Sequence, residues 1–185
     1  LRRVIMSEVP TVGFRTEPYT ESGVKIIKNT SSLHNEFLSH RFGMIPVHIK
    51  NIDDYNPEEY KFILDVKNNE DKIINVTTKD IKVIKNNEEI STVERDVLFP
   101  PDLISNDYIL INRLKPDASG KDVGEEIYIE AKAVVSNGKE NARWSPVSQV
   151  SFNNKVDEIK KNKTLDIIKE KFKLQNKGNM SVEEE

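Results

Sequence analysis

Three histidines are the residues of this 185-residue chain best suited to metal or acid–base chemistry: His34, His40 and His48. On a helix the side chains of His34 and His40, six residues apart, would point about 120° from each other. They would therefore not converge on one metal ion. The chain contains no cysteine, which excludes disulfides, thiolate catalysis, zinc ribbons and iron–sulfur clusters. We expect no metal and no cofactor.

Adjacent carboxylates are the other candidates for chemistry, and they occur as Asp53-Asp54, Glu58-Glu59 and Glu125-Glu126. Neighbouring residues of a strand point to opposite faces, so the last pair would make a poor acid–base couple. We interpret all three pairs as solvated. The sequence also lacks a glycine-rich phosphate loop and a G-x-S-x-G nucleophile motif. We therefore predict no active site, and we expect a chain that is not itself an enzyme.

The composition of the chain excludes two further classes of protein, those that bind nucleic acid by charge and those that span a membrane. Charged residues make up 32% of the chain, but the net charge is only −3 and the pI is near 5.8. The basic excess that drives electrostatic binding to nucleic acid is missing, so we expect no direct sequence-specific nucleic acid binding. No apolar run approaches the roughly 20 residues that span a bilayer, and residues 1–10 lack the features of a secretory signal. An intracellular, soluble protein without membrane contact is expected.

The first nine residues are predicted to form a helix. Its apolar face carries Leu1, Val4, Ile5 and Val9. Pro10 ends the helix, because the residue before a proline leaves the α region. No capping residue precedes Leu1, and residues 180–185 end without an element that could pack. We expect these 185 residues to be an internal piece of a longer polypeptide; a processed or divergent natural terminus is the alternative.

A second helix is expected after residue 30, with Ser31 or Ser32 as its cap and with Gly43 and Pro46 at its end. A helical wheel places apolar and polar side chains together on one broad arc: Leu33, Phe37, Leu38 and Phe42 with His34 and Arg41. Because buried cationic groups need acceptors, we expect His34 and Arg41 to make internal hydrogen bonds that fix this helix to a sheet.

Residues from about 47 to 152 are predicted to be mostly β. Alternation is clearest from Ile127 to Ala133, where the odd positions would face a core. With the two strands expected before the second helix, the predicted strands are Thr11–Arg15, Val24–Lys28, Tyr60–Val66, Ile73–Thr78, Ile81–Ile84, Tyr108–Leu114, Glu126–Val135 and Gln149–Phe152. Since long crossover helices are lacking, we favour an α+β fold, a mostly antiparallel sheet with one packed helix.

The last part of the chain returns to helix. We expect this helix over residues 155–174, with Thr164 as a possible cap. Leu165, Ile168 and Phe172 would form its apolar stripe. Residues 175–185 are polar and are predicted to be a linker.

Three segments of the chain point to one known family. They are LRRVIMSEVPT at residues 1–11, NTSSLHNEFLSHRFGMIP at residues 29–46 and ARWSPV at residues 142–147. Together they resemble the signatures of the alpha-like subunits of multisubunit DNA-directed RNA polymerases: the eukaryotic third subunit, its archaeal counterpart and, more distantly, bacterial alpha. The second segment is similar nearly residue for residue to the eukaryotic and archaeal signature. The third departs from the family's "(H)AKWSPV", with Asn141 where histidine is usual and Arg143 for lysine.

The resemblance implies a two-domain plan. Residues 1–10 would be the end of the first helix of a dimerisation domain. Residues 11–150 would form a β-rich domain inserted into it. Residues 151–185 would return toward the dimerisation domain with a helical insertion and a polar linker. On this plan the dimerisation domain, built of helices and sheet, is only partly present. Some members of the family carry cysteines in the insert for zinc or an iron–sulfur cluster; this chain has none, so that cofactor does not carry over.

The resemblance also implies roles for particular residues in a non-catalytic assembly subunit. Leu1, Val4, Ile5 and Val9 would dimerise with a small alpha-like subunit, and the pair would be the platform for the second-largest and then the largest polymerase subunit. Arg2 and Arg3 would contact a large subunit. Trp144 would either anchor its loop on its own domain or be an interface hot spot. The structural signature residues would be His34, Phe37, Arg41, Gly43, Pro46, Trp144 and Pro146.

Two further expectations follow from the resemblance. The protein would act in the nucleus, or in a viral factory or virion, because a cysteine-free member rich in lysine, asparagine and isoleucine suggests an AT-rich large DNA virus or a protist. The alternative function is a free-standing β-rich protein-binding adaptor that kept the family's sequence but left the polymerase.

Overall fold

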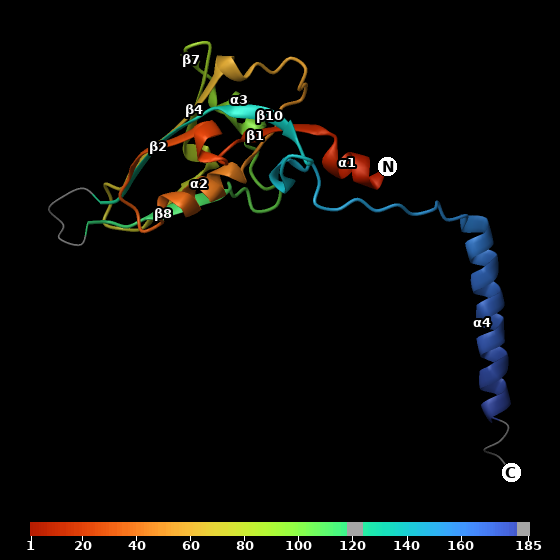
Figure 1. Ribbon diagram of the computed structural model, residues 1–185. Helices are drawn as coiled ribbons and strands as arrows, with labels where there is room; N and C mark the ends of the chain where they lie inside the picture. The colour runs from red at the N-terminus through yellow and green to blue at the C-terminus, as the bar shows by residue number, and fades with distance from the viewer. Residues whose placement is uncertain (118–123, 181–185) are drawn as a thin grey trace. The chain divides into compact units, whose positions relative to one another are not determined.

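The computed structural model describes residues 1–117 and 124–180 (Figure 1). The chain divides into two compact units, Leu1–Val150 and Ser151–Glu185, which are described separately below. The first unit groups the first helix with the β-rich part. Whether residues 11–150 are inserted into a dimerisation domain stays a prediction.

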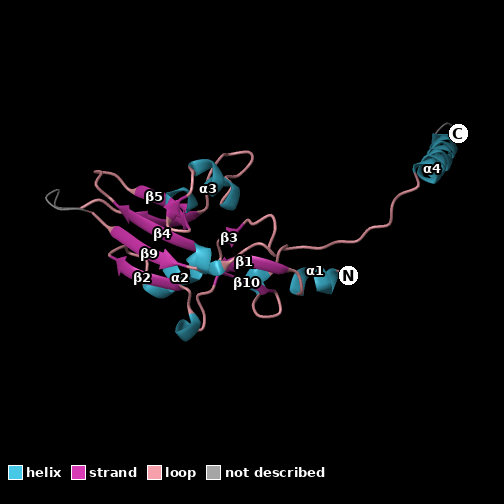
Figure 2. Ribbon diagram, turned by 90° about the horizontal axis from the view of Figure 1, so that it is seen from above, coloured by secondary structure: helices cyan, strands magenta, loops and turns pink. Residues whose placement is uncertain are grey.

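The first unit is a mixture of helices and short strands, as its sequence predicts (Figure 2). Its helices are α1 (Arg2–Ser7), α2 (Asn35–Gly43) and α3 (Thr92–Leu98). Its strands are β1 (Pro10–Phe14), β2 (Val24–Asn29), β3 (Pro46–Val47), β4 (Tyr60–Lys67), β5 (Ile74–Thr77), β6 (Ile81–Lys85), β7 (Glu88–Glu89), β8 (Leu110–Leu114), β9 (Glu126–Ala131) and β10 (Ala133–Asn137). Short 3-10 turns are η1 (Tyr19–Glu21), η2 (Pro57–Glu59), η3 (Thr78–Asp80) and η4 (Ala142–Trp144).

The strands form three antiparallel sheets, with orders β2-β9-β4-β6-β7, β10-β1-β3 and β5-β8. The single strand predicted over residues 126–135 is in fact two strands in different sheets. They are separated at Lys132, whose backbone N–H donates to the carbonyl of Gly23 at 2.9 Å. The chain therefore passes from the five-stranded to the three-stranded sheet at this residue, which the alternation pattern does not reveal.

One hydrophobic core joins the sheets to α2. The predicted alternation in β9 is confirmed, because Ile127, Ile129 and Ala131 are at most 2% exposed. Four phenylalanines form a chain of ring contacts through the core: Phe14 lies 4.7 Å from Phe42 and 5.1 Å from Phe62, and Phe62 lies 6.0 Å from Phe99, measured between ring centroids. Such pairs add to the stabilisation from burial alone.

Two local features depart from the sequence prediction. Helix α3 was not expected, although Ser91 and Glu94 form a capping box at its start. Residues 149–152, predicted as a strand, have no regular structure. That run offers only Val150 and Phe152 for burial, and Phe152 is 84% exposed, so too little apolar surface is removed from water to hold a strand.

The second unit contains one helix, α4 (Glu158–Met180). Asp157 caps it, because its carboxylate accepts the backbone N–H groups of Ile159 and Lys160 at 3.1 and 3.2 Å. Thr164 is not the cap; its hydroxyl donates to the Lys160 carbonyl inside the helix at 2.8 Å. Helix continues through Met180, so the linker expected from residue 175 is wrong as far as 180, and residues 181–185 lie outside the described part.

The apolar stripe expected on α4 is present at Leu165, Ile168 and Phe172, which are 42, 43 and 62% exposed. Lysine and glutamine favour helix as readily as apolar residues do, which explains why a polar sequence continues the helix. Within residues 1–117 and 124–180, no helix combines the length and the apolar character needed to cross a membrane.

Candidate functional site

The apolar face of α1 is open to solvent in this chain. Leu1 is 91% exposed, Val4 47% and Val9 39%, whereas Ile5 is half-buried. No residue of this six-residue helix is fully buried. Because isolated helices shorter than about 12 residues are marginal in water, α1 depends on contacts with the rest of the unit.

Those contacts lie at the end of α1, on the turn that follows β10. The Ser7 carbonyl accepts the backbone N–H of Lys139 at 3.1 Å. The Lys139 ammonium pairs with the Glu8 carboxylate at 2.9 Å. Gly138 lies so close to the helix that a Cβ at this position would overlap the Met6 carbonyl oxygen. The last turn of α1 is therefore held by the β-rich unit.

Arg2 and Arg3 occupy the first turn of α1, and both are exposed. Neither guanidinium makes a hydrogen bond or an ion pair with any residue in 1–117 or 124–180. A guanidinium offers a planar set of donors that matches a carboxylate on another chain. Both arginines are therefore available to such a chain.

The cap of α2 is His34 rather than Ser31 or Ser32. His34 Nδ1 accepts the backbone N–H of Glu36 at 3.4 Å, in an extended conformation that ends before the helix. Asn29 holds Ser31 instead, because its side-chain oxygen accepts the Ser31 N–H at 3.0 Å. His34 is exposed, so the expected bond from His34 to a sheet is wrong.

The apolar face of α2 is narrower than the helical wheel predicts. Leu38 and Phe42 are fully buried against β1, β2 and β8, but Phe37 is 66% exposed. The helix begins only at Asn35, and strands lie along one side of it. The bond expected from Arg41 to a sheet is confirmed, although Arg41 is exposed rather than buried: its Nη2 donates to the Leu110 carbonyl of β8 at 2.9 Å.

The second and third sequence segments meet at Gly43. A Cβ at this position would lie 2.6 Å from Arg143 Nη1 and 2.8 Å from the Thr16 hydroxyl oxygen. Arg143 donates to that same hydroxyl and also pairs with Glu17 through Nη2 at 3.3 Å. Its side chain is only 6% exposed. Gly43 thus leaves the space in which a nearly buried guanidinium binds its partners.

The first and third segments meet at Trp144. Its ring is 2% exposed and packs on Gly13 of β1, where a Cβ would lie 3.0 Å from Trp144 Cζ3. The Thr11 hydroxyl donates to the Trp144 carbonyl at 2.8 Å. Of the two roles considered for Trp144, these contacts support anchoring on its own domain. Pro46 begins β3 opposite Gly13, and Pro146 is exposed.

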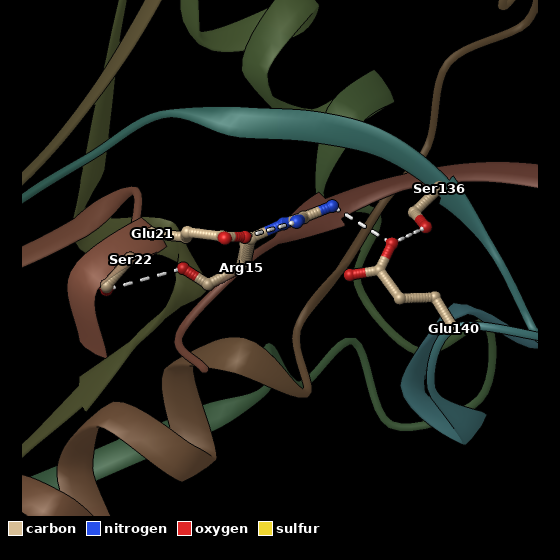
Figure 3. Close-up of polar contacts among 5 residues, drawn as sticks. All are labelled: Arg15, Glu21, Ser22, Ser136 and Glu140. Carbon is tan, nitrogen blue, oxygen red and sulfur yellow. Dashed lines mark hydrogen bonds and ion pairs between the residues drawn. The ribbon is translucent and has the colours of Figure 1, made fainter. Parts of the chain in front are cut away.

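An ion-pair network that sequence reasoning missed lies beside this junction (Figure 3). Arg15 lies between two carboxylates, 3.3 Å from Glu21 Oε2 and 2.9 Å from Glu140 Oε2. The Ser136 hydroxyl donates to Glu140, and the Ser22 hydroxyl donates to the Arg15 carbonyl at 3.4 Å. The only sequence signal is a lone arginine directly after the apolar end of β1.

Three of the resolved pKa shifts show the influence of hydrogen-bonded ion pairs or of burial. Lys28 lowers the pKa of Glu126, and Lys61 with Tyr128 lowers the pKa of Glu130, all on one sheet face. Burial raises the pKa of Tyr55, whose hydroxyl donates to the Ala133 carbonyl at 3.0 Å. These groups have structural partners, so the open features of the first unit are surfaces rather than reactive side chains.

The candidate ligands of the sequence analysis do not gather in space. Within the described part of the chain, no three histidine or carboxylate side chains are close enough to share a metal ion. Glu125 and Glu126 bind separate partners: Glu125 accepts the backbone N–H of Lys115 at 2.8 Å, and Glu126 pairs with Lys28.

Comparison with known proteins gives relatives over most of the chain, although no protein-family model matches it. It is 30% identical to the DNA-directed RNA polymerase II subunit RPB3 of Schizosaccharomyces pombe, over 82% of this chain and 50% of that protein. It is also 30% identical to the DNA-directed RNA polymerases I and III subunit rpac1 of Dictyostelium discoideum, over 82% of this chain and 44% of that protein. A conjugation stage-specific protein of Tetrahymena thermophila is 26% identical to it, over 82% of this chain and 50% of that protein.

The chain spans about half the length of these curated relatives. All three come from cellular eukaryotes, so they give no support to the viral source that the composition suggested. The matches to polymerase subunits agree with the three sequence segments, which the fold brings into contact through Gly43, Arg143 and Trp144. Over most of its length the chain is thus a homologue of the alpha-like subunits of multisubunit DNA-directed RNA polymerases.

Proposed function

We propose that this chain is part of a non-catalytic assembly subunit of a DNA-directed RNA polymerase that acts in the nucleus. It pairs with a small alpha-like subunit through α1. The pair is then the platform on which the second-largest and the largest subunits dock. Similarity to polymerase subunits over most of the chain supports the polymerase, and the open surface of α1 supports this mode of assembly.

The observation that carries the proposal is the exposed apolar face of α1. Leu1 at the N-cap and Val4 in the first turn are 91 and 47% exposed, and Val9, two residues after the helix ends, is 39% exposed. Each 100 Å² of apolar surface that a partner removes from water contributes about 2.5 kcal/mol. A partner helix that covers this face therefore gains stability that the chain alone cannot obtain.

Co-purification tests the proposal directly. The full-length protein is expressed with the small alpha-like subunit encoded in the same genome, and Val4→Asp is compared with the parent. We expect the parent to retain the small subunit and Val4→Asp to lose it, because burying a carboxylate in an apolar contact is costly. Val93→Asp is the matched control, since Val93 is a 73% exposed valine on α3. Equal binding by Val4→Asp and the parent contradicts the proposal.

Arg2 and Arg3 have a separate role in this proposal, the recruitment of a large subunit. Their guanidinium groups are exposed and have no partner among the described residues. Reversing both charges, Arg2→Glu with Arg3→Glu, leaves dimerisation nearly intact and abolishes recruitment of the large subunits. Loss of both steps together would show that the two roles are not separate.

The second candidate is a free-standing protein-binding adaptor. It is favoured by the core of the first unit, which lies wholly within residues 1–150. The same pull-down separates the two functions. Capture of the small and large polymerase subunits supports the assembly subunit, whereas a stable parent protein that captures none of them supports the adaptor.

A further inference from the structure

The turn between β10 and η4 has a role that its sequence resemblance does not assign. We infer that Gly138 and Lys139 are positioning residues, which hold α1 at the angle where its apolar face meets the partner. The inference rests on the proposed function, because it concerns the same face of α1. Neither residue lies on that face.

Three independent contacts join this turn to α1. The Lys139 backbone N–H donates to the Ser7 carbonyl at 3.1 Å, and the Lys139 ammonium pairs with Glu8 at 2.9 Å. Gly138 packs directly against the Met6 carbonyl oxygen of α1, which would overlap a Cβ at this position. The donor at Lys139 satisfies one of the carbonyl groups that a helix leaves free at its end.

The turn is itself held rigidly from both sides. Before it, β10 pairs with β1, so that Asn137 lies opposite Pro10. After it, Glu140 binds Arg15, and the Trp144 carbonyl accepts the Thr11 hydroxyl. Residues 137–144 therefore enclose the junction of α1 with β1. A rigid support of this kind fixes the direction of a helix that is too short to be stable alone.

The fraction of molecules in which α1 is held in place determines the affinity for the partner. The apparent dissociation constant equals the intrinsic constant divided by the fraction of molecules whose binding surface is correctly placed. If a variant holds α1 in place about one tenth of the time, affinity falls about ten-fold although no contact residue has changed. A residue that only maintained the fold would lower stability without this selective effect.

The test is Gly138→Ala in the full-length protein. Amide hydrogen exchange is measured for α1, where the N–H groups of Ile5 and Glu8 bond within the helix. Affinity is measured for the small alpha-like subunit encoded in the same genome. Gly124→Ala is the control. A Cβ there would lie 2.6 Å from the Lys115 carbonyl oxygen, so the clash is also with backbone, and none of the atoms it would meet belongs to α1.

We expect Gly138→Ala to speed exchange in α1 and to weaken partner binding about ten-fold, while exchange in β4 and β9 stays slow. The control should change neither α1 exchange nor affinity. Unchanged α1 exchange in Gly138→Ala overturns the inference, and so does faster exchange with unchanged affinity. A parent protein that does not bind the small subunit contradicts the proposed function instead, and the exchange data then decide separately whether the turn supports α1.

Discussion

Gly43 is a residue whose missing side chain leaves room for Arg143 and Thr16. In an exposed helix, replacing glycine by alanine stabilises by up to about 1 kcal/mol. Here the new methyl group would lie 2.6 Å from Arg143 Nη1 and 2.8 Å from Thr16 Oγ1. Arg143 would have to leave two partners, so we expect Gly43→Ala to lower the free energy of unfolding by about 1–3 kcal/mol. Urea denaturation monitored by Trp144 fluorescence measures it.

Ser39→Ala is a suitable control for this change, because Ser39 lies on the same helix and is only half-buried. We expect its free energy of unfolding to stay within about 0.5 kcal/mol of the parent. A stabilised Gly43→Ala protein would mean that Arg143 can move away at no cost, and that the buried guanidinium is not tied to this position.

At the scale of elements, the sequence predicts what depends on near neighbours. The alternation of Ile127, Ile129 and Ala131 identifies β9, because this signal is local. Pro10 predicts a helix end nearby, but α1 already ends at Ser7 and Pro10 begins β1. The cap of α2 depends on a distant contact: the Ser31 hydroxyl accepts the side-chain N–H of Asn112 in β8 at 2.8 Å and donates to Asn29. His34 instead accepts the backbone N–H of Glu36. Likewise the passage between sheets at Lys132 depends on Gly23, which no pattern within β9 could indicate.

Replacing each phenylalanine of α2 by alanine should show which of the two side chains stabilises the fold. Phe42 is fully buried, whereas Phe37 is 66% exposed, although both belong to the same predicted apolar arc. We expect Phe42→Ala to cost about 3–5 kcal/mol of unfolding free energy. Phe37→Ala should cost less than about 0.5 kcal/mol. Thermal and urea denaturation of both variants measure the difference; similar losses would show that Phe37 packs against something outside the described residues.

The stability of the protein should depend on pH through an ion pair on the five-stranded sheet. Lys61 of β4 lowers the pKa of Glu130 in β9 below the usual 4.5, so the folded state binds protons less readily than the unfolded state. The pair therefore stabilises above that pH, and its contribution is lost as the pH falls through the lowered pKa. We expect the melting temperature of Glu130→Gln to fall less than that of the parent below about pH 4.5.

Glu88→Gln is the control for that titration, because Glu88 is exposed and lies on the edge strand β7. Its melting temperature should follow the parent at every pH. If Glu130→Gln also follows the parent, the cross-strand pair makes no difference between the folded and unfolded states, as many exposed pairs do not.

At the scale of the whole molecule, the sequence segments that identify the family are also the ones that contact one another. Gly43 of the second segment lies against Arg143 of the third, and the Thr11 hydroxyl of the first segment donates to the Trp144 carbonyl. The resemblance thus points to segments that lie together in space, but it does not explain the packing of Gly43, or of Gly13 just after the first segment. The physical reason is three-dimensional: two glycines leave room for two large side chains of one loop.

The division of the chain leads to a last prediction. Every residue of the core cluster lies in residues 1–150, and the described side chains of the second unit, through residue 173, are all exposed. Because burial of apolar surface dominates folding, a protein ending at Val150 should keep the unfolding free energy of the parent within about 0.5 kcal/mol. Its urea slope should be the same, since that slope follows the surface exposed on unfolding. A large loss of stability, or a changed urea slope, would contradict the conclusion that residues 1–150 contain the whole folded core.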